Sequence, residues 1–278
     1  MKYFNASFKD FNFDELIIIP FLLLIMFGWV MISSASFDFA SNHHNDPFFY
    51  FKRHGFYLLI SILAVIFSLK IPINIWEKSG PYLLISSLIL LILILIPGIG
   101  YKANNATRWL ALGPFTFQVS EFAKIGLIIY LGNYLVRQHD LVTNQFKGFF
   151  YPILMLVTLV ALLLFEPDYG AAVVITSTAL VMLFLGGVIF WQFNIVLIVL
   201  SFLFVGFIFL EEYRIERLYA YLDPWSDQYG QGYQLTQSLI AFGRGEWFGL
   251  GLGNSIQKLF YLPEAHTDFI FAIIAEEF

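Results

Sequence analysis

Three polar side chains crowd together directly before an apolar run near residue 269: Glu264, His266 and Asp268. A carboxylate at the mouth of a membrane helix can act as a general base, because burial moves its pKa towards the working pH. The alternative is structural. Asp268 would cap the helix that follows, a role that Asp favours, and His266 would make an interfacial hydrogen bond. Spacing alone favours the structural alternative.

A second group of ionisable residues lies around another apolar run. Lys102, Arg108 and Trp109 fall in one connection, and Glu121 and Lys124 fall in the segment after it. Ionisable groups inside a membrane are costly and are by default functional. Arg108 could hold an anionic lipid or pyrophosphate by a bidentate contact, or it could anchor the chain at the interface beside Trp109. Glu121 and Lys124 are three residues apart, so they share a helix face and could merely neutralise each other.

The remaining polar motifs have adequate structural explanations. Glu166-Pro167-Asp168 fits a polar turn in which proline ends a helix. Five glycines between residues 243 and 253 lack the βαβ context of a nucleotide site and indicate close packing. No metal site is predicted, because His43-His44 fits a solvated loop and the chain has no cysteine.

The elements that must position these residues are membrane helices. Of the 278 residues, 59% are hydrophobic and 13% are charged, about half the charged share of a globular domain. A soluble fold of this size could not bury that much apolar surface. The net charge of −5 also argues against nucleic acid as a partner, because nucleic acid selects basic faces.

The charge-free stretches locate the crossings, since a spanning helix needs about 20 mostly apolar residues. Residues 16–37, 79–101 and 148–165 each fit one crossing, and residues 169–210 fit two joined near Gly186-Gly187. Less uniform runs at 54–69 and 117–136 add two more, and an apolar run begins at Phe269. The sequence therefore predicts an all-α, polytopic membrane protein with seven complete transmembrane helices and the start of an eighth.

A long loop, residues 211–267, follows the seventh predicted helix. Its 57 residues far exceed the usual connection length, and its many aromatic residues argue against disorder. We expect an ordered, partly re-entrant structure on the membrane. The distribution of Lys and Arg only slightly favours a cytoplasmic N-terminus. With this loop left out, that orientation places six Lys and Arg residues inside and four outside.

Several motifs closely resemble those of the SEDS (shape, elongation, division and sporulation) family. They are residues 224–227, 232–238, 241–245, 251–255 and 261–269, with 105–109, 118–121 and Lys124, and Pro167-Asp168 with Gly170. Gln237-Ser238 with 241–246 is more similar to the FtsW division branch than to the RodA elongation branch. Two positions depart from the family pattern: Val119 replaces a usual Pro, and Ala275 replaces a common Gly.

The resemblance implies an inner-membrane enzyme that polymerises lipid II into septal peptidoglycan strands. Family members have ten helices and a periplasmic loop after helix seven, so residues 1–278 would be one incomplete membrane domain, and we expect it to be inactive or unstable alone. Asp268 falls on the essential carboxylate, while Arg108, Trp109, Glu121 and Lys124 fall on other functional positions. Glu264 and His266 would join them in substrate binding.

The implied chemistry inverts the anomeric carbon. Asp268 would take the proton from the acceptor 4-hydroxyl, and Arg108 and Lys124 would offset the charge of the leaving pyrophosphate. No cofactor is specified, although a divalent cation could share that task. The expected partners are lipid II, membrane lipid, a class B penicillin-binding protein transpeptidase and other divisome proteins.

Two other functions stay open. A lipid II flippase would use Glu121 and Lys124 as a gated intramembrane pair, although the sequence shows none of the internal repeats that favour a transporter. A non-catalytic scaffold would only position a transpeptidase at the septum.

Overall fold

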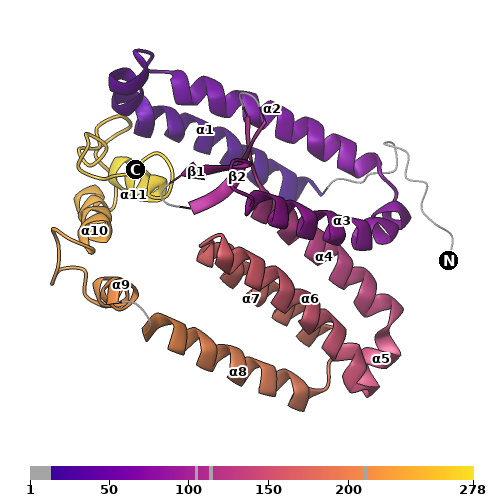
Figure 1. Ribbon diagram of the computed structural model, residues 1–278. Coiled ribbons are helices and arrows are strands. Elements are labelled where there is room, and N and C mark those ends of the chain that lie inside the picture. The colour runs from indigo at the N-terminus through magenta and orange to yellow at the C-terminus, as the bar shows by residue number, and fades with distance from the viewer. Residues whose placement is uncertain (1–13, 104–105, 113–114, 210–211) are drawn as a thin grey trace. The chain divides into compact units, whose positions relative to one another are not determined.

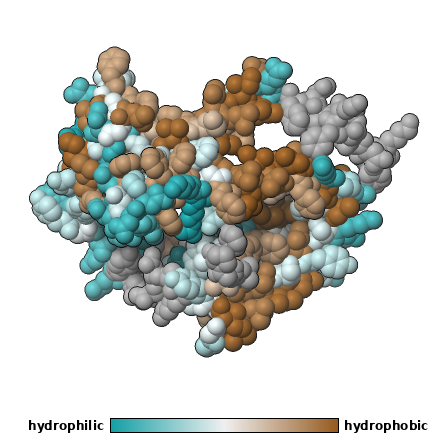
Figure 2. All heavy atoms as spheres, turned by 90° about the horizontal axis from the view of Figure 1, so that it is seen from above, coloured by the Kyte–Doolittle hydropathy of each residue, from teal (hydrophilic) through white to brown (hydrophobic). Residues whose placement is uncertain are grey.

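The computed structural model describes residues 14–103, 106–112, 115–209 and 212–278, and most of these residues are helical (Figure 1). Among the described residues, five helices are long and apolar enough to cross a membrane, and two shorter apolar helices cover Tyr169–Leu185 and Phe190–Gly206. Figure 2 shows hydrophobic side chains over much of the face it presents. Leu59, Leu63 and Phe67 of one such helix are each more than half exposed. A surface of this kind confirms the prediction of a multi-pass helical membrane protein.

The chain divides into two compact units, which are described separately. The central unit comprises residues 71–203, and the terminal unit comprises residues 1–70 with 204–278. The helix α8 (Phe190–Phe209) contributes residues to both.

Helix packing organises the central unit. It contains α3 (Ile73–Ile94), α4 (Val119–Arg137), the short α5 (His139–Asn144), α6 (Phe146–Phe165) and α7 (Tyr169–Leu185). Buried leucines fill the core between α3, α4 and α6: Leu84, Leu91, Leu127, Leu131, Leu159 and Leu163. Gly126 allows α4 to lie directly against α3, because a Cβ there would come within 2.7 Å of the Ser87 hydroxyl.

A small antiparallel sheet joins α3 to α4, in the order β1 (Gly100–Ala103), β2 (Ala106–Leu112) and β3 (Phe115–Gln118). The all-α prediction was wrong for this connection. Its strands have only four to seven residues, so they give little periodic signal beside the long apolar helices. The turn-forming pairs Asn104-Asn105 and Gly113-Pro114 stand between them in the sequence, outside the described residues. The predicted fourth helix accordingly begins at Val119 rather than Phe117.

The terminal unit is built around α1 (Glu15–His44) and α2 (Phe49–Lys70). Asp14 caps α1 by accepting a 3.0 Å hydrogen bond from the Leu16 N–H. Trp29 of α1 stacks on Phe51 of α2 at 4.6 Å and donates a 3.0 Å hydrogen bond to its carbonyl. The pair is thus held by an aromatic contact and a partly buried hydrogen bond.

The predicted long loop is ordered where it is described, although Glu211 lies outside the described residues. It contains α9 (Glu212–Leu222) and α10 (Tyr233–Gly245). Turns then lead to α11 (Ile270–Glu277), an eight-residue helix at the place of the predicted eighth helix. A second core cluster joins α10 and α11 to α1: Met31, Ala35, Ala241, Leu262, Ala265, Ala272 and Ile273. The segment between α10 and α11 carries the first candidate site.

Candidate active site

Asp268 lies at the entrance to α11 with an exposed side chain. The N-cap of α11 is Phe269, and no side chain makes a capping hydrogen bond there. Asp268 forms no hydrogen bond or ion pair with the residues that the structure describes. The structural alternative, in which Asp268 caps the helix, is therefore not the observed arrangement, and its carboxylate is available to a ligand.

The turn before Asp268 is shaped by Glu264. Its backbone is left-handed, with φ 55°, and its carbonyl accepts hydrogen bonds from the Thr267 and Phe269 N–H groups at 3.1 and 3.2 Å. The Thr267 hydroxyl donates to the Glu264 carboxylate at 2.8 Å. Glu264 thus shapes the backbone that presents Asp268.

His266 is half-buried among aromatic rings. Its ring lies 5.0 Å from that of Phe39 on α1 and 4.7 Å from that of Tyr50 on α2. Burial lowers the pKa of the His266 imidazole, while the nearby Glu264 opposes this effect. A neutral ring packed in this way anchors the Asp268 turn to the paired helices α1 and α2.

Arg108 on β2 is held by the turn between α6 and α7. Its guanidinium donates to the Pro167 carbonyl, and its Nε lies 3.8 Å from the Asp168 carboxylate. The Asp168 carboxylate is itself held in place, because it caps α7 by accepting a 3.4 Å hydrogen bond from the Ala171 N–H. The Arg108 side chain is 36% exposed, so it still reaches the surface where an anion could bind.

Glu166, which the sequence predicted only as part of a polar turn, adds a buried carboxyl. It is completely buried, and neither carboxylate oxygen has a hydrogen-bond partner among the described residues. Burial raises the pKa of Glu166 to about 8, the negative charge of Asp168 adds to the rise, and Arg108 opposes it. The Glu166-Pro167-Asp168 segment is therefore more than a polar turn, because it places two buried acids near Arg108.

Glu121 and Lys124 form the predicted intrahelical pair, with 2.6 Å between Nζ and Oε1. Lys124 also lines a cavity of about 100 Å³ between α4 and α7, among apolar side chains. Trp109 is half-buried and lies opposite Tyr101 on β1 and Gln118 on β3. Of the neighbouring candidates, the Lys102 side chain and Asn105 lie outside the described residues.

The predicted site residues thus fall into two groups. Glu264, His266 and Asp268 share one turn of the terminal unit, whereas Arg108, Trp109, Glu121 and Lys124 belong to the central unit. Within the described residues, no three His, Asp or Glu side chains are grouped to hold a metal ion.

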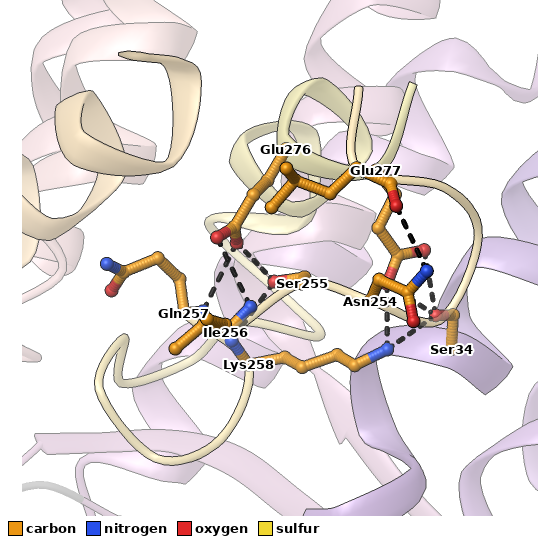
Figure 3. A network of polar contacts seen from close by, with 9 residues as sticks. Ser34, Asn254, Ser255, Ile256, Gln257, Lys258, Glu276 and Glu277 are labelled. Carbon is orange, nitrogen blue, oxygen red and sulfur yellow. Dashed lines mark hydrogen bonds and ion pairs between the residues drawn. The ribbon is translucent and has the colours of Figure 1, made fainter. Parts of the chain in front are cut away.

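The sequence analysis did not predict a buried polar network that involves α11. Glu276 and Glu277 meet Lys258 and Ser34 there (Figure 3). One signal could have found it: two carboxylates inside an apolar run require partners.

The similarity to known proteins extends over both groups of predicted site residues. The FtsW/RodA/SpoVE family model, described as cell cycle protein, matches residues 14–278. A protein of Alteromonas naphthalenivorans is 46% identical over 265 residues and one of Coxiella burnetii is 47% identical over 273. Both are named probable peptidoglycan glycosyltransferase FtsW. The matches cover 95% and 98% of this chain, and 51% and 73% of those proteins. The chain thus spans about half of one relative and about three quarters of the other.

A solved structure agrees with the fold. It comes from a peptidoglycan synthase complex described for its structural coordination of polymerization and crosslinking. The match has a TM-score of 0.65 and 28% identity, over 91% of this chain and 70% of that chain. The likeness therefore extends over most of the described helices.

Proposed function

The chain belongs to the FtsW/RodA/SpoVE family of cell cycle proteins, and we propose that it is a peptidoglycan glycosyltransferase that polymerises lipid II into glycan strands. Two relatives named as such support the proposal. The observation that carries it is the carboxylate of Asp268 at the start of α11, which is exposed and does not cap the helix. We place the protein in the bacterial inner membrane, at the division septum.

The proposed topology has seven crossings with the N-terminus inside: α1, α2, α3, α4, α6, α7 and α8. Counting crossings along the chain puts the β1–β3 sheet, the turn at residues 166–168 and the segment 211–267 on the periplasmic side. α11 would then begin the eighth crossing.

The proposed reaction joins two lipid-linked saccharides. Asp268 takes the proton from the acceptor 4-hydroxyl, and the oxygen attacks the anomeric carbon of the donor. The bond from that carbon to the pyrophosphate oxygen breaks, so an α linkage becomes β. The pyrophosphate leaves with the bonding electrons, and Arg108 and Lys124 offset its charge. Trp109, Glu121, Glu264 and His266 line or shape the substrate site. A divalent cation, if bound, would share the neutralisation of the leaving pyrophosphate with these two side chains.

The proposed partner is a class B penicillin-binding protein transpeptidase, with other divisome proteins. Support comes from the similar solved structure, which belongs to a complex that coordinates polymerization with crosslinking. A transpeptidase would consume the strands that the polymerase releases.

The test is lipid II polymerisation by the full-length protein with its transpeptidase in liposomes. Wild type is expected to make glycan strands and Asp268→Asn none. The matched control is Asp223→Asn, which alters an exposed carboxylate elsewhere in the same unit. Equal synthesis by Asp268→Asn would refute the assigned base. Transfer of lipid II across the bilayer without synthesis would favour a flippase. Normal division with the Asp268→Asn protein would favour a scaffold.

A further inference from the structure

The segment that carries Asp268 has no helix or strand between α10 and α11. Three of its residues other than glycine have left-handed backbones: Glu246, Phe260 and Glu264, with φ of 50°, 67° and 55°. Such conformations are costly and persist only where the surrounding structure imposes them. Contacts with the rest of the terminal unit must therefore hold this segment in place.

Glu276 makes the first of these contacts. Its carboxylate accepts hydrogen bonds from the Ser255 hydroxyl and from the N–H groups of Ile256 and Gln257, the latter two at 3.2 Å (Figure 3). Arg244 of α10 adds an ion pair, with Nε 3.4 Å from Oε1. One carboxylate at the end of α11 thus organises the turn at residues 255–257.

Glu277 makes the second contact. Lys258 donates to its carboxylate at 2.7 Å, and the Ser34 hydroxyl of α1 donates to both oxygens at 2.9 Å. Lys258 also donates to Ser34 at 3.1 Å. The Gly251 N–H donates to the Glu277 carbonyl at 3.0 Å. The glycine-rich turn, α1 and α11 therefore meet at one residue, Glu277, through its backbone carbonyl and its side chain.

These charges are almost completely buried. Glu276 is 0% exposed, Glu277 1% and Lys258 8%. An apolar replacement of a buried ion pair is often as stable as the pair itself, so burial energy alone does not explain the charges. What an apolar side chain cannot supply is a set of directed hydrogen bonds that fixes one register of the loop on the helix.

The two ends of α11 are mechanically linked. The described α11 residues, Ile270–Glu277, extend over about 12 Å. Asp268 lies two residues before it, and the Ala272 N–H donates to the Phe269 carbonyl at 3.0 Å. α10 packs directly on α11, since a Cβ on Gly245 would overlap the Ala275 carbonyl. A tilt or rotation of α11 at Glu276 and Glu277 is thus transmitted to Asp268.

We infer that Lys258, Glu276 and Glu277 are positioning residues, whose buried network sets the placement of the proposed base Asp268 through α11. The inference rests on the proposed glycosyltransferase function. It assigns these residues no contact with substrate. Because a misplacement of about 1 Å can cost about a hundredfold in rate, loss of the network is expected to reduce kcat and leave KM for the lipid donor unchanged.

The experiment compares single and double variants of the full-length protein. Lys258→Gln or Glu277→Gln alone leaves one buried charge unpaired, and both should melt earlier than wild type. Lys258→Gln with Glu277→Gln removes both charges and should recover most of the melting temperature. We expect this double variant to keep its KM while kcat falls about a hundredfold. Lys258→Arg keeps the charge and should retain most of kcat.

An exposed pair in the same unit supplies the matched control. Lys52 and Asp46 lie 2.9 Å apart, with side chains 67% and 37% exposed. Lys52→Gln with Asp46→Asn removes one charge of each sign and should leave kcat unchanged. A stable double variant of Lys258 and Glu277 with wild-type kcat would overturn the inference.

Amide hydrogen exchange separates this inference from the proposed function. In the Lys258 and Glu277 double variant, the N–H groups of Thr267 and Phe269 should exchange faster, although they lie at the opposite end of α11. Unchanged exchange at both would overturn the inference whatever the activity. If the wild type makes no glycan while exchange at these two amides still rises, the polymerase proposal fails and the positioning of the Asp268 turn stands. Ser34→Ala, which leaves both charges in place, should give the same pattern with a smaller loss of kcat.

Discussion

Replacing Glu166 by glutamine should stabilise the protein at high pH. Glu166 is 0% exposed, and both of its carboxylate oxygens lack hydrogen-bond partners within the described residues. Burial is the main cause that raises its pKa from 4.5 to about 8, and the charge of Asp168 adds to it. The folded protein therefore favours the neutral carboxyl group, which a glutamine side chain imitates.

The sign of the pH effect follows from linkage. The folded pKa lies above the unfolded value, so the stabilisation is complete below pH 4.5 and is lost as the pH rises through about 8. A shift of that size corresponds to about 5 kcal/mol. Relaxation of the structure and water penetration around a buried ion reduce this penalty, and we expect a measurable change of about 2 kcal/mol.

Thermal melting in nanodiscs at pH 5 and pH 9 measures the effect. At pH 5 wild type and Glu166→Gln should melt together, because Glu166 is protonated. At pH 9 the variant should melt about 5 °C higher, given about 2–4 °C per kcal/mol for a chain of this size. Glu216→Gln, an exposed change in α9, should show no such dependence on pH. If Glu166→Gln melts below wild type at pH 9, the ionised carboxylate has a stabilising partner and the reasoning is refuted.

Two further predictions concern single contacts. Arg108→Lys should lower the rate of lipid II polymerisation about tenfold or more. The reason is that lysine cannot contact both the Pro167 carbonyl and the Asp168 carboxylate as the guanidinium does. An unchanged rate would show that only the positive charge matters. Gly245→Ala should lower the free energy of unfolding by about 1–3 kcal/mol, since its Cβ would overlap the Ala275 carbonyl, and an unchanged melting temperature would contradict that close packing.

The helices were predictable because lipid leaves a strong composition signal. The charge-free run 148–165 lies within α6, and Gly186-Gly187 falls between α7 and α8 as expected. The sheet was not predictable in the same way. Its short strands acquire their hydrogen bonds from one another, and a pattern of four residues does not distinguish a strand from a polar turn.

The candidate site was predictable only where its residues are adjacent in sequence. Glu264, His266 and Asp268 stand within five residues, and Glu121 and Lys124 share a helix turn. By contrast, the bond from Ser34 to Glu277 joins residues 243 positions apart. Arg108 meets the Pro167 carbonyl across 59 positions. No local pattern encodes such pairs, because packing of the helices creates them.

The two kinds of carboxylate near α11 follow from opposite physical demands. A base must reach a substrate proton, so Asp268 is exposed and has no partner among the described residues. A support must be fixed, so Glu276 and Glu277 are buried and accept several hydrogen bonds. The same short helix presents the first and anchors the other two. Apolar side chains in place of Glu276, Glu277 and Lys258 would therefore preserve the fold and lose the reaction, because they would keep the helix without fixing the direction of its first turn.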